Sequence, residues 1–315
     1  MKVVFCLLGW CIAQSVWGQD IEYPYQHDLK GSVQVCSEKK FKARMEGNKV
    51  VRGDYQADKH LGVRVFDQAG RLVEFREQPD STDGGQFKKW TVTYDAAGCW
   101  QQVTEYQEDG RFDSRQDYTC DRKGRVTERL DYYYLYGDRP TEITTYKYDD
   151  AGRLTERHNR YGDPKQGPKR YPPQFVQDKY KHRYNVYDQN GYLVKWSIKY
   201  EGIDPEFGAL ASGAAEVTND AQGRPIAEYG LNDLAAKEKN TQAKKLQKEM
   251  VYNAQGLIAQ LVEYRGYGGP KTTYYDYTYD DHGNWITRTE LIGTMKPGKV
   301  NAALESITVR EIKYY

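Results

Sequence analysis

The chain has 315 residues with 46 basic and 45 acidic side chains, and its formal net charge at pH 7 is +1. Because nucleic-acid-binding proteins normally carry a strongly basic face, this balance argues against a nucleic-acid partner. The mean hydropathy of −0.90 is low for a globular protein, and 29 residues are tyrosines. We therefore expect tyrosine rings to supply much of the buried apolar surface while their hydroxyl groups stay hydrated.

Residues 1–18 have the layout of a secretory signal peptide. Lys2 precedes an apolar run from Val3 to Ala13, and the segment ends at Gly18. Cleavage near Gly18 predicts a secreted, periplasmic or cell-envelope protein. After this segment no stretch has the roughly 20 apolar residues that a spanning helix needs, so the mature chain is expected to contain no membrane span.

One pentad recurs eight times between residues 60 and 290: a variable, often aromatic residue, then Asp or Asn, two variable residues and Gly. Such self-similarity is the signature of a repeat architecture. Residues 60–290 are therefore interpreted as a repeat domain, preceded by an N-terminal strand and capping segment over 19–59 and followed by a closing strand over 291–315. The paired turn residues are Asp67 and Gly70, Asp95 and Gly98, Asp121 and Gly124, Asp149 and Gly152, Asp188 and Gly191, Asp220 and Gly223, Asn253 and Gly256, and Asp280 and Gly283.

Each pentad has the composition of a β-hairpin turn. Asp or Asn accepts backbone hydrogen bonds at the start of the turn, and Gly takes the left-handed conformation that closes a type I turn with a bulge. Replacing Gly152 with a β-branched residue is expected to misalign its hairpin, since a positive φ is costly for such a side chain. Apolar residues two places after most glycines mark the inward face of the following strand. These residues are Leu72, Trp100, Val126, Leu154, Leu193, Ile258 and Trp285.

This pattern resembles that of YD-repeat proteins, whose larger relatives are the RHS (rearrangement hotspot) proteins and the teneurins. The resemblance is clearest at residues 148–154, Tyr-Asp-Asp-Ala-Gly-Arg-Leu, and extends over about residues 60–290. It implies a long antiparallel sheet wound as a spiral. In large members of the family the spiral closes into a hollow shell around a toxin segment.

The sequence predicts an all-β fold in which antiparallel β-hairpin repeats form an extended, curled meander sheet, an open spiral. Eight hairpins provide about sixteen strands, which by analogy are too few for a sealed container, and residues 291–315 are not expected to form a toxin domain. An open sheet has two edge strands that must be protected from pairing with other chains. The segment before residue 60 and residues 306–314 are the candidates to form or cover these edges.

Three inserts interrupt the repeats. Residues 161–176 are rich in proline and are expected to form an irregular loop, and residues 202–216 are small and flexible in character. Residues 231–249 are rich in Ala, Lys, Gln and Glu, with Asn232 or Asp233 as a cap, and predict one short inserted surface helix. This helix either packs lightly on the sheet or binds a partner.

Three cysteines, Cys36, Cys99 and Cys120, remain after removal of the signal peptide. If the turn at residues 108–110 pairs its flanking strands so that partner numbers sum to about 219, Cys99 lies opposite Cys120. A disulfide between them would close a loop of about 20 residues and contribute roughly 3 kcal/mol, leaving Cys36 outside the bridge. The alternative is a pair of reduced, buried residues, because a register shift of one residue puts the two on opposite faces.

The sequence contains no recognisable catalytic motif. HExxH, GxSxG, Walker A and GxGxxG patterns are absent, and the five histidines lack metal-ligand spacing. Acidic residues are plentiful, but those in the repeated turns already have a structural role, so no catalytic pair of carboxylates stands out. We therefore expect no enzymatic activity, no cofactor and no bound metal.

A tyrosine-rich stretch gives the remaining functional indication. Tyr132 and Tyr134 are expected on one face of a strand and Tyr133 on the other, with Tyr136 following, so at least one set is exposed. Exposed tyrosines bind sugar rings or protein partners, although they also cover sheets that are short of aliphatic residues. The sequence favours an exported, non-enzymatic repeat scaffold that binds an unidentified protein or glycan partner through a curved β surface. The alternative is a shortened RHS-type component of a toxin-delivery or encapsulation system.

Overall fold

The computed structural model describes residues 29–47, 49–56, 58, 61–77, 88–134, 137, 140–161, 180–201, 213–231, 244–264, 269–296 and 299–315. These residues form nineteen β-strands, and every pairing between strands is antiparallel. The predicted signal peptide over residues 1–18 lies outside the described residues. The strands are β1 (Val33–Glu46), β2 (Lys49–Gln56), β3 (Gly62–Phe66), β4 (Leu72–Glu77), β5 (Lys89–Tyr94), β6 (Trp100–Tyr106), β7 (Phe112–Cys120), β8 (Val126–Tyr133), β9 (Glu142–Tyr148), β10 (Leu154–Tyr161), β11 (Tyr180–Tyr187), β12 (Leu193–Glu201), β13 (Gly213–Asn219), β14 (Pro225–Leu231), β15 (Lys244–Tyr252), β16 (Ile258–Tyr264), β17 (Pro270–Tyr279), β18 (Trp285–Lys296) and β19 (Lys299–Tyr314).

Each of the eight pentads joins two consecutive strands, from β3 and β4 to β17 and β18. The pentad glycines have φ between +75° and +86°, and the N–H of each donates to the carbonyl of the turn Asp or Asn at 2.9–3.0 Å. The acidic side chain completes the turn. For example, Oδ1 of Asp67 accepts the backbone N–H groups of Ala69 and Arg71, both at 2.9 Å. These local bonds explain why the sequence repeats a short side-chain acceptor and a glycine at fixed spacing.

Substitution of Gly152 by valine is expected to lower the free energy of unfolding by about 1–2 kcal/mol or more. The φ of Gly152 is +83°, which a β-branched residue adopts only with strain. Urea denaturation measures the loss. Gly213→Val is the control, because Gly213 has no positive φ and no atom of the described residues lies within 4 Å of an added Cβ. Equal losses for the two variants would contradict the role of the left-handed conformation.

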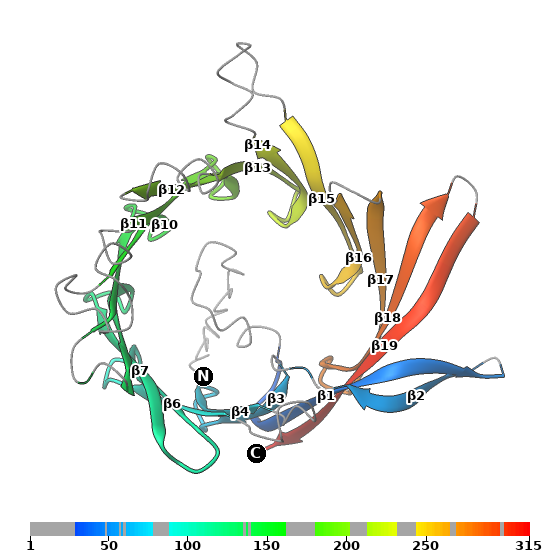
Figure 1. The fold of residues 1–315 in the computed structure, drawn as a ribbon, viewed down its shortest axis with the longest axis horizontal. Helices are drawn as coiled ribbons and strands as arrows, with labels where there is room; N and C mark the ends of the chain where they lie inside the picture. Colours follow the sequence, from blue (N-terminus) through cyan, green and yellow to red (C-terminus); the bar gives the residue numbers. More distant parts are fainter. Residues whose placement is uncertain are drawn as a thin grey trace, which may run out of the picture.

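The sheet closes into a ring, so the prediction of an open, curled meander is wrong. Strand β1 lies between the two ends of the repeat array: Cys36 is the cross-strand partner of Ile312 in β19 on one side and of Arg64 in β3 on the other. Strands β1 and β3 to β19 therefore form a closed, 18-stranded antiparallel barrel, visible as the ring in Figure 1. Strand β2 pairs with the far half of β1, and this hairpin projects from the ring.

Strands β1 and β19 meet in a corner that has the same backbone hydrogen bond as the eight pentad turns. Val33 pairs with Tyr314, and the N–H of Tyr315 donates to the carbonyl of Ser32 at 3.0 Å. In the pentads the turn Asp or Asn donates in the same way to the residue four positions later. Gly31, with φ of +82°, takes the place of the pentad glycine. Two segments far apart in the sequence thus build a ninth corner between β19 and β1.

The prediction of an inserted helix over residues 231–249 is also wrong for the residues that the structure describes. Leu231 ends β14, and Lys244–Tyr252 forms β15, which pairs with β14 and β16. Helix propensity differs by less than about 1 kcal/mol per residue, so pairing on both sides of β15 outweighs it. Likewise, residues 213–216 of the insert predicted to be flexible belong to β13. The rest of the three inserts, residues 162–176, 202–212 and 232–243, lies outside the described residues.

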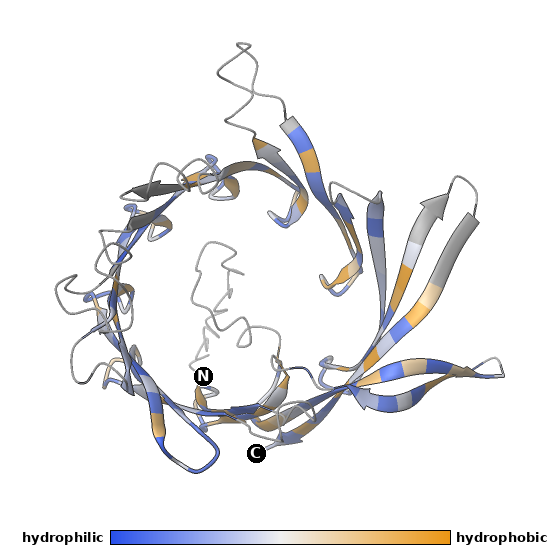
Figure 2. Ribbon diagram, viewed as in Figure 1, coloured by the Kyte–Doolittle hydropathy of each residue, from blue (hydrophilic) through white to orange (hydrophobic). Residues whose placement is uncertain are grey.

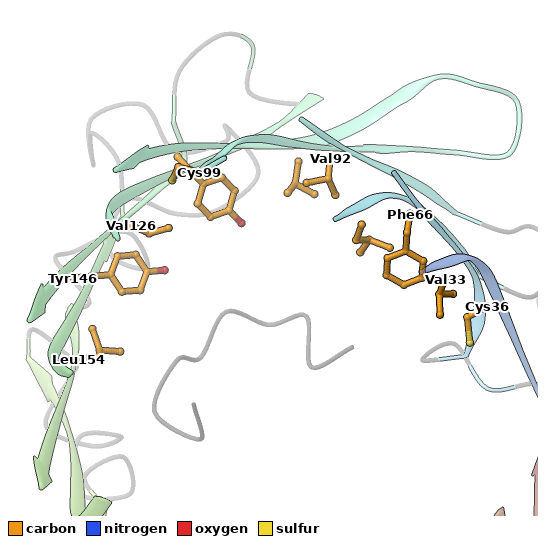
Figure 3. Packing of buried hydrophobic residues seen from close by; sticks show 11 residues of the cluster. Val33, Cys36, Phe66, Val92, Cys99, Val126, Tyr146 and Leu154 are labelled. Carbon is orange, nitrogen blue, oxygen red and sulfur yellow. The ribbon is translucent and has the colours of Figure 1, made fainter. Parts of the chain in front are cut away.

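Apolar side chains gather on the concave face of the ring. Figure 3 shows Phe66, Val92, Val126, Tyr146 and Leu154 pointing to this side, and each is less than 9% exposed. Figure 2 shows the matching alternation of hydrophobic and hydrophilic residues along the strands. Among the described residues there is no apolar helix of membrane-spanning length.

The convex face carries charged side chains. Lys147 follows Tyr146 in β9 and therefore points to the opposite face. Its Nζ lies 2.8 Å from Oε2 of Glu156 in the neighbouring strand, and the lysine side chain is 63% exposed. At Tyr146 and Lys147 the period-two pattern of the strand thus puts an apolar ring inside and a charged group outside.

Candidate functional site

Neighbouring hairpins are fastened by a repeated contact, which we call the corner stack. Nε of Arg125 lies 2.7 Å from Oδ2 of the turn residue Asp121, and the guanidinium carbon lies 4.8 Å from the ring centre of Tyr148 in the next hairpin. The Tyr148 hydroxyl reaches back and donates to the carbonyl of Val126 at 2.8 Å. Burial raises the pKa of Tyr148 to about 12. The same stack joins Arg71 to Tyr94, Arg153 to Tyr187 and Arg224 to Tyr252 at 4.6–5.1 Å.

The corner stacks explain how a ring can bury apolar residues on a curved single sheet. Each tyrosine ring lies across the neighbouring hairpin, and the arginine covers the ring. Leu72, Val126 and Leu154 lie in this layer and are 4%, 8% and 2% exposed. In the motif Tyr-Asp-x-x-Gly-Arg-Leu, the aspartate binds within its own hairpin, the tyrosine contacts the preceding hairpin and the arginine contacts the next.

A disulfide takes the place of one corner stack. Cys99 stands four residues after Asp95, in the position of the corner arginine, and Cys120 stands directly before Asp121, in the position of the corner tyrosine. The structure joins them as a disulfide with Cα atoms 6.6 Å apart. Strands β6 and β7 have the register that the sequence predicted for this pair. Cys36 lies outside the bridge and is fully buried.

This disulfide indicates a compartment outside the cytoplasm. Disulfides persist in oxidising environments such as the periplasm or the extracellular space and are rare where glutathione keeps thiols reduced. The bridge between Cys99 and Cys120 is therefore consistent with export of the chain.

A buried ion-pair cluster lies where the ring closes. Glu38 in β1 binds Nη2 of Arg64 in β3 at 2.8 Å and also pairs with Nε of Arg310 in β19. The three side chains are at most 5% exposed. Burial opposes ionisation of Glu38, but Arg64 and Arg310 together hold its pKa below the ordinary value. We call this group the closure cluster, because its members come from the three strands that complete the barrel.

The structure separates the tyrosines of the predicted binding stretch. Tyr132 faces the convex side, where Arg115 lies 4.3 Å from its ring centre. Tyr133 is paired with Ser114 on the concave face and is 47% exposed, while Tyr134 is 52% exposed just beyond the strand. Tyr136 lies outside the described residues.

Carboxylates surround Tyr133 on the concave face. We call Glu105, Ser114, Asp131, Tyr133 and Glu142 the inner patch. Ser114 donates its hydroxyl to Glu105 at 2.7 Å, and Asp131 is the cross-strand partner of Glu142. Burial, followed by the negative charges of Asp131, Glu142 and Glu105, raises the pKa of Tyr133.

Basic and amide neighbours hold the acidic side chains of the inner patch in place. Lys88 pairs with Glu105, and Asn159 donates to Glu142. Asp131 accepts hydrogen bonds from Gln116 at 2.8 Å and from Arg129 at 2.9 Å, and Arg129 also lies 3.8 Å from Glu142. Burial raises the pKa of Asp131, with Arg129 opposing and Glu142 adding to this rise. The patch therefore combines fixed carboxylate acceptors with an exposed amphipathic ring, a combination that suits sugar hydroxyls or protein N–H groups.

The carboxylates of the inner patch were not predicted from the sequence. They come from β6, β8 and β9, and only the strand register puts them beside Tyr133. The sequence could have predicted these carboxylates if the residue pairs across β5 to β9 had been counted outward from each turn. In the part of the chain that the structure describes, no group of three or more His, Cys, Asp or Glu residues is arranged to hold a metal ion.

Comparisons with known proteins do not assign the chain to a family. No family model matches the sequence, and no curated protein matches it. The crystal structure of a porin-like protein from Bacteroides uniformis is similar with a TM-score of 0.44 and 14% identity, covering 90% of this chain and 99% of that one. The crystal structure of TcdB2-TccC3 without its hypervariable C-terminal region has a TM-score of 0.29 and 11% identity, covering 76% of this chain and 15% of that one. The resemblance to YD-repeat proteins thus depends on the turn motif alone.

Proposed function

We propose that the protein is an exported, non-enzymatic scaffold that binds a protein or glycan partner on the concave face of its ring. The observation that carries the proposal is the inner patch, where Tyr133 stays 47% exposed beside the carboxylates of Glu105, Asp131 and Glu142. An aromatic ring that is kept accessible among polar groups is typical of recognition surfaces.

The strand number supports binding on the inside. Eighteen strands spaced about 4.8 Å apart have a combined width of about 86 Å before tilting, and barrels of this size enclose more space than side chains fill. A partner segment can therefore reach the concave face. The inner patch holds three carboxylates against two cations, Lys88 beside Glu105 and Arg129 beside Asp131 and Glu142. This net negative charge disfavours phosphate-bearing partners, since like charges repel.

A glycan array probed with the mature protein tests the carbohydrate form of the proposal. Binding of a neutral or basic glycan is expected, and Tyr133→Ala should weaken it at least about tenfold, as loss of a central aromatic contact does. Tyr132→Ala is the matched control, because Tyr132 neighbours Tyr133 but lies under Arg115 on the convex face.

Two outcomes would change the proposal. Glycan binding that survives Tyr133→Ala would show that the inner patch is not the site. Silence across the array would remove carbohydrate from the proposed partners, leaving a protein.

A second candidate function is a shell component of a toxin-delivery or encapsulation system. Closure of the ring through β1, β3 and β19 favours it, because an enclosing shell needs a sheet without open edges. Co-expression with adjacent reading frames of the source genome tests this function. A neighbouring product that becomes protease-resistant only in the presence of this chain would support enclosure, and one that is digested equally in both cases would contradict it.

A further inference from the structure

The corner between the fifth and sixth hairpins departs from the corner stack. Tyr192 stands four residues after Asp188, where the stack has arginine, and Asn219 stands directly before Asp220, where the stack has tyrosine. The Asn219 side chain donates to the carbonyl of Leu193 at 2.8 Å, as the tyrosine hydroxyl does at other corners. A carboxamide is shorter than a phenol, so this substitution leaves space at the corner.

A cavity of about 580 Å³ occupies this corner. Its lining includes Asp188, Asn190, Tyr192, Asn219 and Asp220. Its volume falls within the range of about 300–1,000 Å³ that is usual for ligand sites. The cavity thus combines two carboxylates, two amides and an aromatic ring.

Tyr192 lies along the next turn. A Cβ added to Gly223 would come within 2.2 Å of the Tyr192 ring, so the ring contacts this glycine directly. At neighbouring corners an arginine covers the following glycine in the same way, as Arg125 does at Gly152. Tyr192 therefore covers the turn without supplying a positive charge.

Among the described residues, no arginine binds the Asp188 carboxylate as the corner arginines bind Asp67, Asp121, Asp149 and Asp220. Oδ1 of Asp188 accepts the backbone N–H groups of Asn190 and Tyr192 at 2.9 and 2.8 Å, as in the other turns. At the turns of the four corner stacks the second carboxylate oxygen binds the arginine Nε of its own hairpin at 2.6–2.8 Å; these acids are Asp67, Asp121, Asp149 and Asp220. At Asp188 the corresponding position is held by Tyr192.

Neighbouring arginines are already engaged. Nε of Arg153 binds Asp149 at 2.6 Å, and its Nη1 donates to the backbone carbonyl of Asp188 rather than to the side chain. Arg224 binds Asp220 at 2.7 Å through Nε. The charge of Asp220 is thus compensated within its own hairpin, and Asp188 supplies the negative charge of the cavity.

We propose that this cavity binds a guanidinium group, with the Asp188 carboxylate as its acceptor and Tyr192 as the adjoining aromatic ring. The four corner stacks are the template, because each places a guanidinium between a turn carboxylate and a tyrosine ring. A guanidinium binds carboxylates in a planar, forked geometry and stacks on aromatic rings, whereas a lysine ammonium is a compact point charge. The inference goes beyond the proposed function, since the cavity is separate from the inner patch.

Titration of the mature protein with Nα-acetyl-L-arginine methylamide, followed by NMR, tests the proposal. Saturable binding with a Kd of about 1 mM is expected for a single small group. The corresponding lysine compound should bind at least about tenfold more weakly, and the citrulline compound, which has the shape of arginine without its charge, should not bind. Equal binding of citrulline and arginine would overturn the proposal.

Asp188→Asn is expected to abolish arginine binding without disturbing the turn, because Asn253 forms the same backbone hydrogen bonds in the seventh pentad. Asp95→Asn is the matched control. Asp95 is a turn acid whose hairpin also lacks the corner arginine, but the disulfide of Cys99 and Cys120 fills that corner. Binding that is lost equally in both variants, or kept in Asp188→Asn, would contradict the assignment.

Tyr192→Arg provides a second, independent readout. The new arginine should bind Asp188 as in the corner stacks, which would raise the urea midpoint and block the added arginine compound. Wild-type binding by this variant would overturn the proposal. An arginine-containing pentapeptide that binds at least about tenfold more tightly than the single-residue compound would identify the source as a partner protein, and equal affinities would identify a small guanidino compound.

Discussion

Glu38→Ala is expected to lower the free energy of unfolding by about 3–5 kcal/mol, the usual cost of removing one partner from a buried ion pair. The substitution leaves Arg64 and Arg310, which are 1% and 5% exposed, without their shared carboxylate. The three side chains come from β1, β3 and β19. Their loss of contact therefore weakens the strand pairing that closes the ring. Urea denaturation followed by tryptophan fluorescence measures the loss of stability.

Glu46→Ala is the matched control for this prediction. Glu46 lies in the same strand and pairs with Arg44 at 2.8 Å, but its side chain is 59% exposed. Exposed ion pairs contribute about 0–1 kcal/mol, so this variant should remain close to wild type. Equal losses in the two variants would mean that the closure cluster does not stabilise the ring.

The pH dependence of stability provides an independent check on Glu38. Its pKa in the folded protein is lower than the ordinary value of 4.5. The carboxylate therefore contributes stability above the unfolded-state pKa, and this contribution disappears as the pH falls through the lower pKa of the folded state. The free energy of unfolding, measured between pH 7 and pH 3, should therefore fall less steeply with decreasing pH in Glu38→Ala than in wild type.

Replacing both Cys99 and Cys120 with serine is expected to cost about 3 kcal/mol, because the bridge constrains a loop of about 20 residues in the unfolded chain. Reduction of the wild-type protein should produce the same loss. Urea denaturation in the presence and absence of dithiothreitol compares the two. A double-serine variant as stable as oxidised wild type would contradict a stabilising role for the disulfide.

The double variant Cys99→Arg, Cys120→Tyr refines this test. It installs the corner stack in place of the disulfide, with Asp95 positioned to bind the new arginine. A cation–π contact contributes about 0.5–2 kcal/mol, so part of the lost stability should return. If it is no more stable than the double-serine variant, the two kinds of corner are not equivalent.

The hairpins could be predicted from the sequence because their determinants lie within a few residues of each other. The Asp67 side chain bonds to backbone groups two and four residues away, and the left-handed φ of Gly152 is a property of one residue. The register between β6 and β7 follows from such a turn, which is why Cys99 and Cys120 were expected to face each other.

The prediction of a surface helix was wrong because the determinants of this segment are not local. Residues 244–249 have a composition that favours helix weakly, but they form β15 between two partner strands. The cross-strand pairs of β15 depend on residues in β14 and β16, which a local propensity does not take into account.

The inner patch is likewise a product of tertiary structure. The sequence pointed to Tyr133, but not to Glu105 or Glu142, whose strands precede and follow its own. Their side chains meet only because consecutive registers across β6 to β9 align them on one face. Burial on the concave side then sets the pKa directions of Tyr133 and Asp131.

By itself the sequence determined the eight turns, the all-β character of the fold and the pairing of strands within each hairpin. These features depend on short-range hydrogen bonds and backbone sterics. Only the tertiary structure decided that the sheet closes. Closure joins Cys36 to Ile312 and to Arg64, and it depends on the twist and curvature accumulated over all the hairpins. A small difference in twist and curvature per strand, summed around the ring, separates an open spiral from a closed barrel. The residues of a single pentad do not determine that sum.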